Sequence, residues 1–198
     1  IGSAGTSVAG IALDASDATT ITGGTGVNAI KGTELPDTIT AGTGIDTVDI
    51  SQGGSDIVVL NDDAASNQSV ITGFAIANDT ITFDESEFAS IAFANTGAVA
   101  ALAAADYNEI ANGGTIVVDK LNIITHAAGY ASYDAAFAAT TASAGGEVIT
   151  GFYNSATSKF ELYFDADGSN NAGEVLIGQI DIAGGDVASL SQTNFAVL

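Results

Sequence analysis

The sequence predicts a mainly β protein, in which a short parallel β-roll is followed by a β-rich capping domain with one or two short helices. Two observations predict this fold. Between Gly23 and Val59 a nine-residue pattern recurs, with glycines ahead of an Asp or Asn and an aliphatic residue two positions later. After residue 60, short runs rich in β-branched and aromatic residues alternate with polar turns, as in a series of strands. We expect the roll to occupy residues 1–60 and the capping domain residues 61–198.

The repeat has the form G-G-x-G-x-D-x-U-x, where U is a large aliphatic residue, and this form is typical of a calcium-binding parallel β-roll. Each U side chain should point into the roll from a short strand, while the six residues before it turn the chain. Glycine in those turns permits positive φ. With a one-residue slip at Ile50, the four units are Gly-Gly-Thr-Gly-Val-Asn-Ala-Ile-Lys (23–31), Gly-Thr-Glu-Leu-Pro-Asp-Thr-Ile-Thr (32–40), Ala-Gly-Thr-Gly-Ile-Asp-Thr-Val-Asp (41–49) and Ser-Gln-Gly-Gly-Ser-Asp-Ile-Val-Val (51–59).

The nonapeptide spacing also predicts which turns stack. Two nonapeptides make one coil of the roll, so every second turn should lie on the same edge. The turn of Asn28 should therefore stack on the turn of Asp46, and the turn of Asp37 on that of Asp56. The stretch 14–22 keeps an aliphatic residue, Ile21, in phase with the later U positions but lacks the glycines. We expect it to form an incomplete first rung.

The turns carry the ligand types that calcium prefers. The sixth position of each unit supplies a carboxylate or amide oxygen, and the glycines let backbone carbonyls converge on an ion. Calcium takes about six to eight hard oxygen ligands, and we predict roughly two to three ions between stacked turns. The candidate ligand positions are Gly23, Gly24, Gly26, Asn28, Gly32, Asp37, Gly42, Gly44, Asp46, Gly53, Gly54 and Asp56.

Charge narrows the classes of partner. The chain of 198 residues has 24 acidic residues against three lysines and no arginine, which gives a net charge of −21. Such a chain repels nucleic acid and anionic membrane surfaces, so neither is expected as a partner. No apolar run approaches the roughly 20 residues that span a bilayer. An excess of carboxylates needs neutralisation from outside, and a divalent metal ion is the natural source.

Two absences bear on the origin of the chain. Cysteine is absent, and a fold held together by metal ions does not need the disulfides common in small secreted domains. The chain starts at Ile1 without the charged and apolar regions of a signal peptide. We therefore expect it to be part of a longer or processed protein.

The remaining elements are predicted from local patterns. Alternating or apolar runs indicate strands at 57–60, 115–119, 121–125, 147–153, 159–164 and 174–181, and two strands within 70–83 bridged by a turn at 77–79; residues 195–198 form an apolar end. An Ala-rich segment, 98–110, and an aromatic segment at helical spacing, 130–140, indicate short helices. Residues 84–88 either start a short helix or leave the sheet.

Three segments, together with the nonapeptides, resemble the C-terminal regions of RTX proteins, which bacteria export through type I secretion systems. They are Val70-Ile-Thr-Gly-Phe…Asn78-Asp-Thr-Ile81, Phe160-Glu-Leu-Tyr-Phe-Asp-Ala-Asp-Gly168 and Leu190-Ser-Gln-Thr-Asn-Phe-Ala-Val-Leu198. They look like the element that follows the roll, a recurrent hairpin and the terminal secretion signal of that family. The resemblance covers residues 23–83 and 147–198. The segment from about 90 to 146 is not explained by the roll motif, but within it Thr125…Tyr130-Ala-Ser-Tyr-Asp-Ala-Ala136 resembles surface-layer-like bacterial proteins.

The resemblance implies an uncleaved C-terminal secretion signal, export of the unfolded chain and folding outside the cell when calcium becomes available. Three departures affect this expectation. Asn28 replaces the usual Asp, so the ion there should be weaker or its coordination incomplete. Leu35-Pro36 replace the usual Gly-x pair of the second unit, and Asn194 replaces Asp in the terminal pattern.

Three other functions were weighed against calcium binding in the roll. His126, the single histidine, has no flanking catalytic pattern, so we expect it at a strand end and expect no catalysis. The segment Asp165–Glu174 is either a second calcium loop or a tight β-turn, although its Gly and Glu do not fall at the EF-hand positions. Thr25 and Thr43 should stack on one edge, but two or three rungs make a small face for binding ice.

The sequence therefore predicts a non-catalytic, secreted, calcium-binding region of a type I-exported bacterial protein. Its partners would be calcium ions and the secretion apparatus, and its location extracellular or at the cell surface. Self-assembly, as in a surface layer, and adhesion to surface polysaccharide remain open. The alternative is the secretion tail of an extracellular protease or lipase whose catalytic domain lies upstream.

Overall fold

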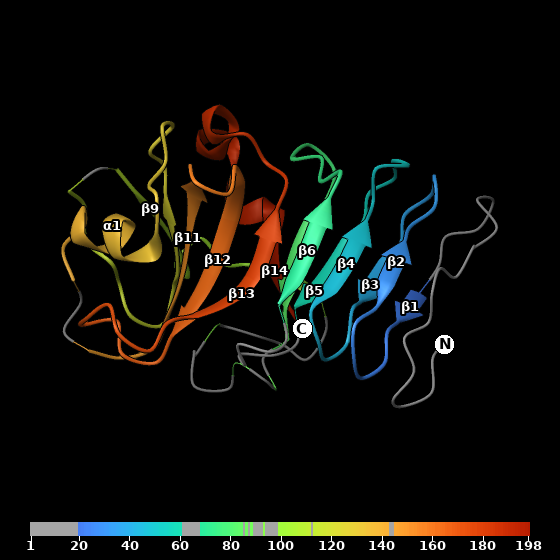
Figure 1. Cartoon of the computed structure of the whole chain (residues 1–198), viewed down its shortest axis with the longest axis horizontal. Coiled ribbons are helices and arrows are strands. Elements are labelled where there is room, and N and C mark those ends of the chain that lie inside the picture. Colours follow the sequence, from blue (N-terminus) through green and yellow to red (C-terminus); the bar gives the residue numbers. More distant parts are fainter. Residues whose placement is uncertain are drawn as a thin grey trace.

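The computed structural model describes residues 20–60, 68–84, 86, 88, 93, 99–111, 113–142 and 145–198. Within these ranges the chain is mainly β, as predicted, with strands β1–β14 arranged in a six-stranded and an eight-stranded sheet and only short helices. Figure 1 shows the roll, in blue to green, at one end of the molecule and helix α1 with strand β9 at the other. In the described ranges no helix combines the length and apolar character needed to cross a bilayer.

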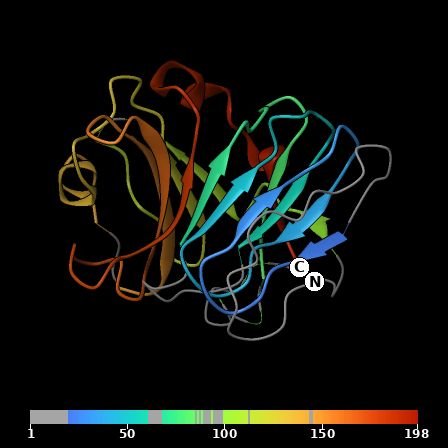
Figure 2. The ribbon, with the colours of Figure 1, turned by 45° about the vertical axis from the view of Figure 1, so that its right-hand side comes forward.

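The roll forms because the chain alternates between the two sheets. Strands β1 (Thr20–Thr22), β3 (Thr38–Thr40) and β5 (Ile57–Leu60) pair in parallel in the six-stranded sheet, and β2 (Ala29–Lys31), β4 (Asp46–Asp49) and β6 (Ser69–Thr72) in the eight-stranded sheet. Figure 2 shows the two sets of strands side by side. Ile21 pairs with Ile39, so the end of the predicted first rung forms a strand of the roll; residues 14–19 lie outside the described residues.

The aliphatic U positions form the inner row of the roll, as the repeat predicts. Ile39, Val48 and Val58 are completely buried, and Ile30 is 8 % exposed. They belong to one apolar cluster that extends from Ile21 to Val197 and so fills both the roll and the following half of the molecule. A single core therefore stabilises both halves.

The roll continues past residue 60. Strand β6 pairs with β4, and β7 (Thr80–Phe83) pairs with β5, both in parallel. The predicted pair of strands within 70–83 is therefore present, but its members lie in different sheets. The division into residues 1–60 and 61–198 stays a prediction, although each sheet contains strands from both sides of residue 60.

Both sheets are then extended by strands from the end of the sequence. Strand β14 (Phe195–Val197) lies between β7, to which it is parallel, and β8 (Ala100–Ala101), to which it is antiparallel. Strand β13 (Val175–Ile180) lies beside β6. The last strand is approached through the 3₁₀ helices η1 (Gly184–Ser189) and η2 (Gln192–Asn194). In Figure 1 the C-terminal end accordingly lies near the middle of the molecule.

Strands β11 (Val148–Asn154), β12 (Lys159–Asp165) and β13 form an antiparallel meander around one buried carboxylate. Glu161 is 1 % exposed and accepts hydrogen bonds from Asn154, Thr157, Tyr163 and Gln179 at 2.7–2.9 Å. A buried charge is tolerated when donors surround it in this way. Glu161 thus joins all three strands of the meander.

A small second core covers the far end of the eight-stranded sheet. Helix α1 (Tyr133–Ala138), capped by Ser132, packs its Tyr133 and Phe137 against Phe152 of β11. This confirms the helix predicted within 130–140, at about half the predicted length. The outermost strands of this sheet are β10 (Leu121–Ile124) and β9 (Tyr107–Ile110).

Two local predictions were wrong. The helix expected over 98–110 is replaced, in its described part, by β8, a turn and β9, because these segments pair with β14 and β10. Alanine favours helices only weakly, and tertiary pairing overrides that preference. The strand expected over 115–119 is a single bridge at Thr115 followed by a turn, because the Asn122 side chain occupies the backbone groups of Val117. Residues 84–88 lie partly outside the described residues.

Candidate metal centre

The turns of the nonapeptides stack in two columns, one on each edge of the roll. On the first edge, the turn with Gly23, Gly24, Gly26 and Asn28 lies on the turn with Gly42, Gly44 and Asp46. Backbone hydrogen bonds from Gly26 to Thr43 (2.7 Å) and from Thr43 to Gly24 (3.2 Å) join them. The backbone N–H of Asn28 donates to Asp46 Oδ1 at 2.7 Å across a separation of 18 residues. This confirms the predicted stacking.

On the second edge, the turn with Gly32 and Asp37 lies on the turn with Gly53, Gly54 and Asp56. The Asp37 N–H donates to Asp56 Oδ1 at 2.9 Å, now across 19 residues because of the slip at Ile50. The Asp56 N–H in turn donates to Asp79 Oδ1 at 3.0 Å, across 23 residues. Three buried carboxylates therefore form a column, and each of the lower two accepts a backbone N–H from the aspartate above it.

Asp79 is the one member of this column that the repeat analysis missed. It is 3 % exposed and its turn lies outside the four nonapeptide units. A signal was present in the sequence, because Asp79 precedes Ile81 by two positions, as Asp37 precedes Ile39 and Asp56 precedes Val58. The Asp-x-aliphatic triplet is therefore the part of the repeat that persists when the glycines are lost.

The four aspartates differ in how many of their oxygens are satisfied. Asp37 Oδ2 accepts the Thr33 N–H at 2.6 Å, and Asp79 Oδ2 accepts the Ala75 N–H at 2.7 Å. By contrast, Asp46 Oδ2 and Asp56 Oδ2 are buried without a hydrogen-bond partner. Buried polar atoms are nearly always paired, so a ligand that approached either of these oxygens would satisfy an otherwise unpaired group.

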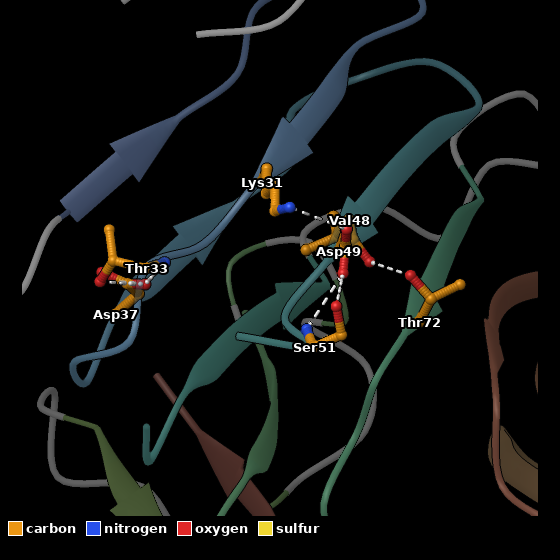
Figure 3. Close-up of polar contacts among 7 residues, drawn as sticks. All are labelled: Lys31, Thr33, Asp37, Val48, Asp49, Ser51 and Thr72. Atoms are coloured by element: carbon orange, nitrogen blue, oxygen red, sulfur yellow. Dashed lines mark hydrogen bonds and ion pairs between the residues drawn. The ribbon is translucent and has the colours of Figure 1, made fainter. Parts of the chain in front are cut away.

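The turn sequences explain why Asp46 and Asp56 have an unpaired oxygen and Asp37 does not. The turns before Asp46 and Asp56 each contain two glycines with φ between 94° and 128°, namely Gly42, Gly44, Gly53 and Gly54. In the turn before Asp37, Leu35-Pro36 stand in place of the usual pair, and the turn closes on its own carboxylate through Thr33 (Figure 3). The two turns with paired glycines thus leave an oxygen free, and the altered turn does not.

Carbonyl oxygens converge beside the free carboxylates. The Asn28 Nδ2 atom lies 2.7 Å from Gly26 O and 3.4 Å from both Gly24 O and Ala41 O. On the other edge, a methyl group added to Gly54 would lie 2.7 Å from Leu35 O and 2.8 Å from Asp56 Oδ1. Both edges therefore offer a cradle of oxygens: on the first edge it surrounds the Asn28 side-chain nitrogen, and on the second it lies against Gly54, which has no side chain.

The crowding around Gly54 predicts unequal effects of alanine substitutions at Gly53 and Gly54. Gly53 and Gly54 both have positive φ, but a methyl group on Gly53 meets nothing within 4 Å. We expect Gly53→Ala to lower the free energy of unfolding by about 1–2 kcal/mol from backbone strain, and Gly54→Ala by roughly 1–3 kcal/mol more through crowding. Urea denaturation in calcium measures both. Equal losses for the two variants would contradict a crowded cradle.

Burial disfavours the charged form of the two aspartates with free oxygens. The pKa of Asp56 is raised to about 6, mainly by burial and also by the charges of Asp79 and Asp37, while the hydrogen bond from the Asp37 N–H opposes the rise. Burial also raises the pKa of Asp46, against the hydrogen bonds from Asn28. Both groups would be stabilised as carboxylates by a bound cation.

The oxygens of this centre come from two separate carboxylates and from backbone carbonyls. Within the described residues, no group of three or more His, Cys, Asp or Glu side chains could hold a metal ion. Carboxylate and carbonyl oxygens are the ligands of calcium, whereas nitrogen and sulfur ligands favour zinc. The arrangement therefore fits a hard, oxygen-seeking ion.

The nearby surface charges are separate from this centre. Lys31 and Asp49 form a 4.0 Å ion pair with side chains 55 % and 35 % exposed, and Ser51 donates to Asp49 through its backbone and hydroxyl. Figure 3 shows them together with Val48 and Thr72, whose hydroxyl donates to the Val48 carbonyl. The hydrogen bonds from Ser51 lower the pKa of Asp49, with a smaller contribution from Lys31.

The other candidate sites show local hydrogen bonding. His126 follows the end of β10, as predicted, and its Nδ1 lies 3.3 Å from Gly129 O. In the segment 165–174, Asp165 accepts from Tyr133 and from the Asp167 N–H, while Asp167 accepts from Ser169 and Asn170. The bonds within 165–170 are local ones, as in a tight turn, and the bond from Tyr133 joins the segment to α1; calcium binding there stays a prediction. Thr25 and Thr43 stack through a parallel bridge, also as predicted.

No protein-family model matches the chain, and neither a curated protein nor a solved structure matches it. The assignment of a function therefore depends on the geometry of the stacked turns and on the sequence patterns.

Proposed function

We propose that this chain is a non-catalytic calcium-binding region whose roll is completed by ions bound between stacked turns. The observation that carries this proposal is the pair of buried, unpartnered oxygens, Asp46 Oδ2 and Asp56 Oδ2. Each belongs to a turn with two positive-φ glycines, and the Oδ1 atom of each carboxylate lies in the same cradle as a backbone carbonyl of the neighbouring turn.

The residues that would hold calcium are the carboxylates of Asp46 and Asp56 and the backbone carbonyls of the turns stacked on them. Bound calcium supplies positive charge that neutralises buried carboxylates and repelling carbonyl dipoles. Asp37 and Asp79, whose oxygens accept hydrogen bonds within their own turns, stabilise the column rather than bind the ion. We therefore propose two calcium sites, the lower end of the two to three predicted from the repeat.

The energetic effect of such sites is large compared with domain stability. A site with a Kd of about 10⁻⁴ M lies in the range of extracellular calcium modules. It contributes about 2.7 kcal/mol at a hundredfold excess of ligand. Two sites would contribute roughly 5 kcal/mol, which is comparable to the whole stability of a marginal domain. The chain would then be loosely folded where free calcium is scarce and folded where it is abundant.

The RTX-like segments support the same proposal from the sequence side. They favour a secreted bacterial protein exported by a type I apparatus, with calcium-triggered folding outside the cell and a role in surface-layer or adhesin assembly. The alternative is the secretion tail of an extracellular protease or lipase. The full reading frame distinguishes the two, since an upstream zinc or serine-hydrolase motif favours the enzyme and repetitive Ala/Thr/Gly-rich sequence the surface layer.

A calcium titration followed by far-UV circular dichroism tests the proposal. We expect a cooperative gain of β signal at sub-millimolar to millimolar calcium, reversed by a chelator, because the orphaned oxygens destabilise the metal-free roll. Magnesium should fail to replace calcium, since it demands a tighter octahedral site and dehydrates reluctantly. A β signal that is complete in chelator and unchanged by calcium would rule the proposal out.

A further inference from the structure

The two edges of the roll differ in the residue that lies next to the buried aspartate. On the first edge the residue at the sixth position is Asn28, which is 4 % exposed. Its amide nitrogen, Nδ2, has four oxygens around it: Gly26 O at 2.7 Å, Asp46 Oδ1 at 3.0 Å, and Gly24 O and Ala41 O at 3.4 Å. On the second edge the corresponding residue is the carboxylate of Asp37.

A shell of four oxygens around one atom is the environment of a bound cation. Three of the four are backbone carbonyls and the fourth is a carboxylate, which are the ligand types of calcium. The amide group carries a partial positive charge on its hydrogens, so it neutralises part of the negative potential in this cradle. With only two hydrogens, however, it can form at most two good hydrogen bonds.

We infer that the Asn28 amide occupies the position of a cation on this edge, so that these two turns remain closed without calcium and the Asp56 edge responds to the ion. This inference rests on the proposed function. For calcium to enter the first edge, the amide must rotate and turn its oxygen inward, and its hydrogen bonds to Gly26 and Asp46 are lost. The free Oδ2 of Asp46 still favours an ion there, so binding at this edge is weakened rather than abolished.

The second edge lacks such a substitute. There the neighbours of Asp56 in its column are two further aspartates, Asp37 and Asp79, whose negative charges face the same buried group. A carboxylate cannot donate a hydrogen bond at neutral pH. The metal-free turns of the second edge are therefore held together against charge repulsion. A divalent ion bound there stabilises the fold more than one bound at the first edge.

The reciprocal exchanges Asn28→Asp and Asp56→Asn test the inference by isothermal titration of calcium and by urea denaturation in chelator. Asn28→Asp should strengthen calcium binding at its edge at least tenfold and lower the metal-free stability. Asp56→Asn should remove the tighter calcium site and raise the metal-free stability. Glu109→Gln removes one negative charge, as Asp56→Asn does, at an exposed position of β9 outside the roll, and should change neither calcium affinity nor metal-free stability.

The outcomes distinguish a failure of the proposed calcium binding from a failure of the role given to Asn28. If the unaltered protein binds no calcium, the proposed function fails. If it binds calcium but Asn28→Asp changes neither affinity nor metal-free stability, the inference alone fails. Should Asn28→Asp be unfolded in chelator, its titration can begin from the calcium-loaded state by competition with a chelator. Asn28→Ala, which removes the amide without adding a carboxylate, should then show the stability loss without the gain in affinity.

Discussion

Replacing Phe195 by alanine is expected to lower the free energy of unfolding by about 3–5 kcal/mol. Phe195 is 1 % exposed and belongs to β14, the strand inserted between β7 and β8. Its ring stacks on Phe83 with centroids 6.3 Å apart and contacts Tyr107 at 6.1 Å. The substitution would therefore open a cavity where the roll meets the following half of the molecule. Urea denaturation in calcium, followed by circular dichroism, measures the loss.

Leu198→Ala is the matched control for this experiment. Leu198 is 38 % exposed, and the bond from its backbone N–H to Phe83 O does not depend on its side chain. We expect a loss below about 0.5 kcal/mol, as for surface substitutions in general. Comparable losses for Phe195→Ala and Leu198→Ala would show that β14 is not part of the cooperative core.

The metal-free protein should become less stable as the pH rises from about 4 to 6. Asp56 has a folded-state pKa of about 6 and an ordinary value of 3.8, raised by burial and then by the charges of Asp79 and Asp37. Between these values the folded state binds more protons than the unfolded state, so stability is greatest below the lower value and falls as pH rises. A difference of about two pKa units corresponds to at most about 3 kcal/mol.

The pH effect is isolated by comparing the unaltered protein with Asp56→Asn across the same range. Asparagine does not titrate, so the difference in unfolding free energy between the two proteins should vary with pH in the window from 4 to 6. Saturating calcium should suppress this dependence, because the ion favours the carboxylate form. A difference that stays constant across the window would refute the prediction.

The nonapeptide pattern specified the roll well because it combines two constraints. The aliphatic residue of each unit must be buried, and the glycines must turn the chain back, so spacing alone predicts which strands pair. The register of Ile39 with Val58 even preserves the slip at Ile50. The burial of Asn28, Asp37, Asp46 and Asp56 follows from the same geometry.

The rest of the fold was harder to predict because it depends on contacts between distant segments. Nothing local in Ala100–Ala101 indicates a strand, and these residues become one only because β14 lies beside them. The role of Asp79 was missed because its turn lacks the paired glycines. Which carboxylate oxygens are free also required the structure, since it depends on donors such as the Thr33 N–H.

The position of β14 has a consequence for the order of folding. Each coil of the roll closes on a neighbour that is close in sequence, so the coils can form one after another from local contacts. Strand β7, however, pairs on one side with β5 and on the other with β14, which is synthesised far later. Pairing between distant segments carries a loop-closure penalty and slows folding. During folding the edge of β7 would therefore stay exposed until β14 pairs with it, and this edge is where premature association between chains would begin.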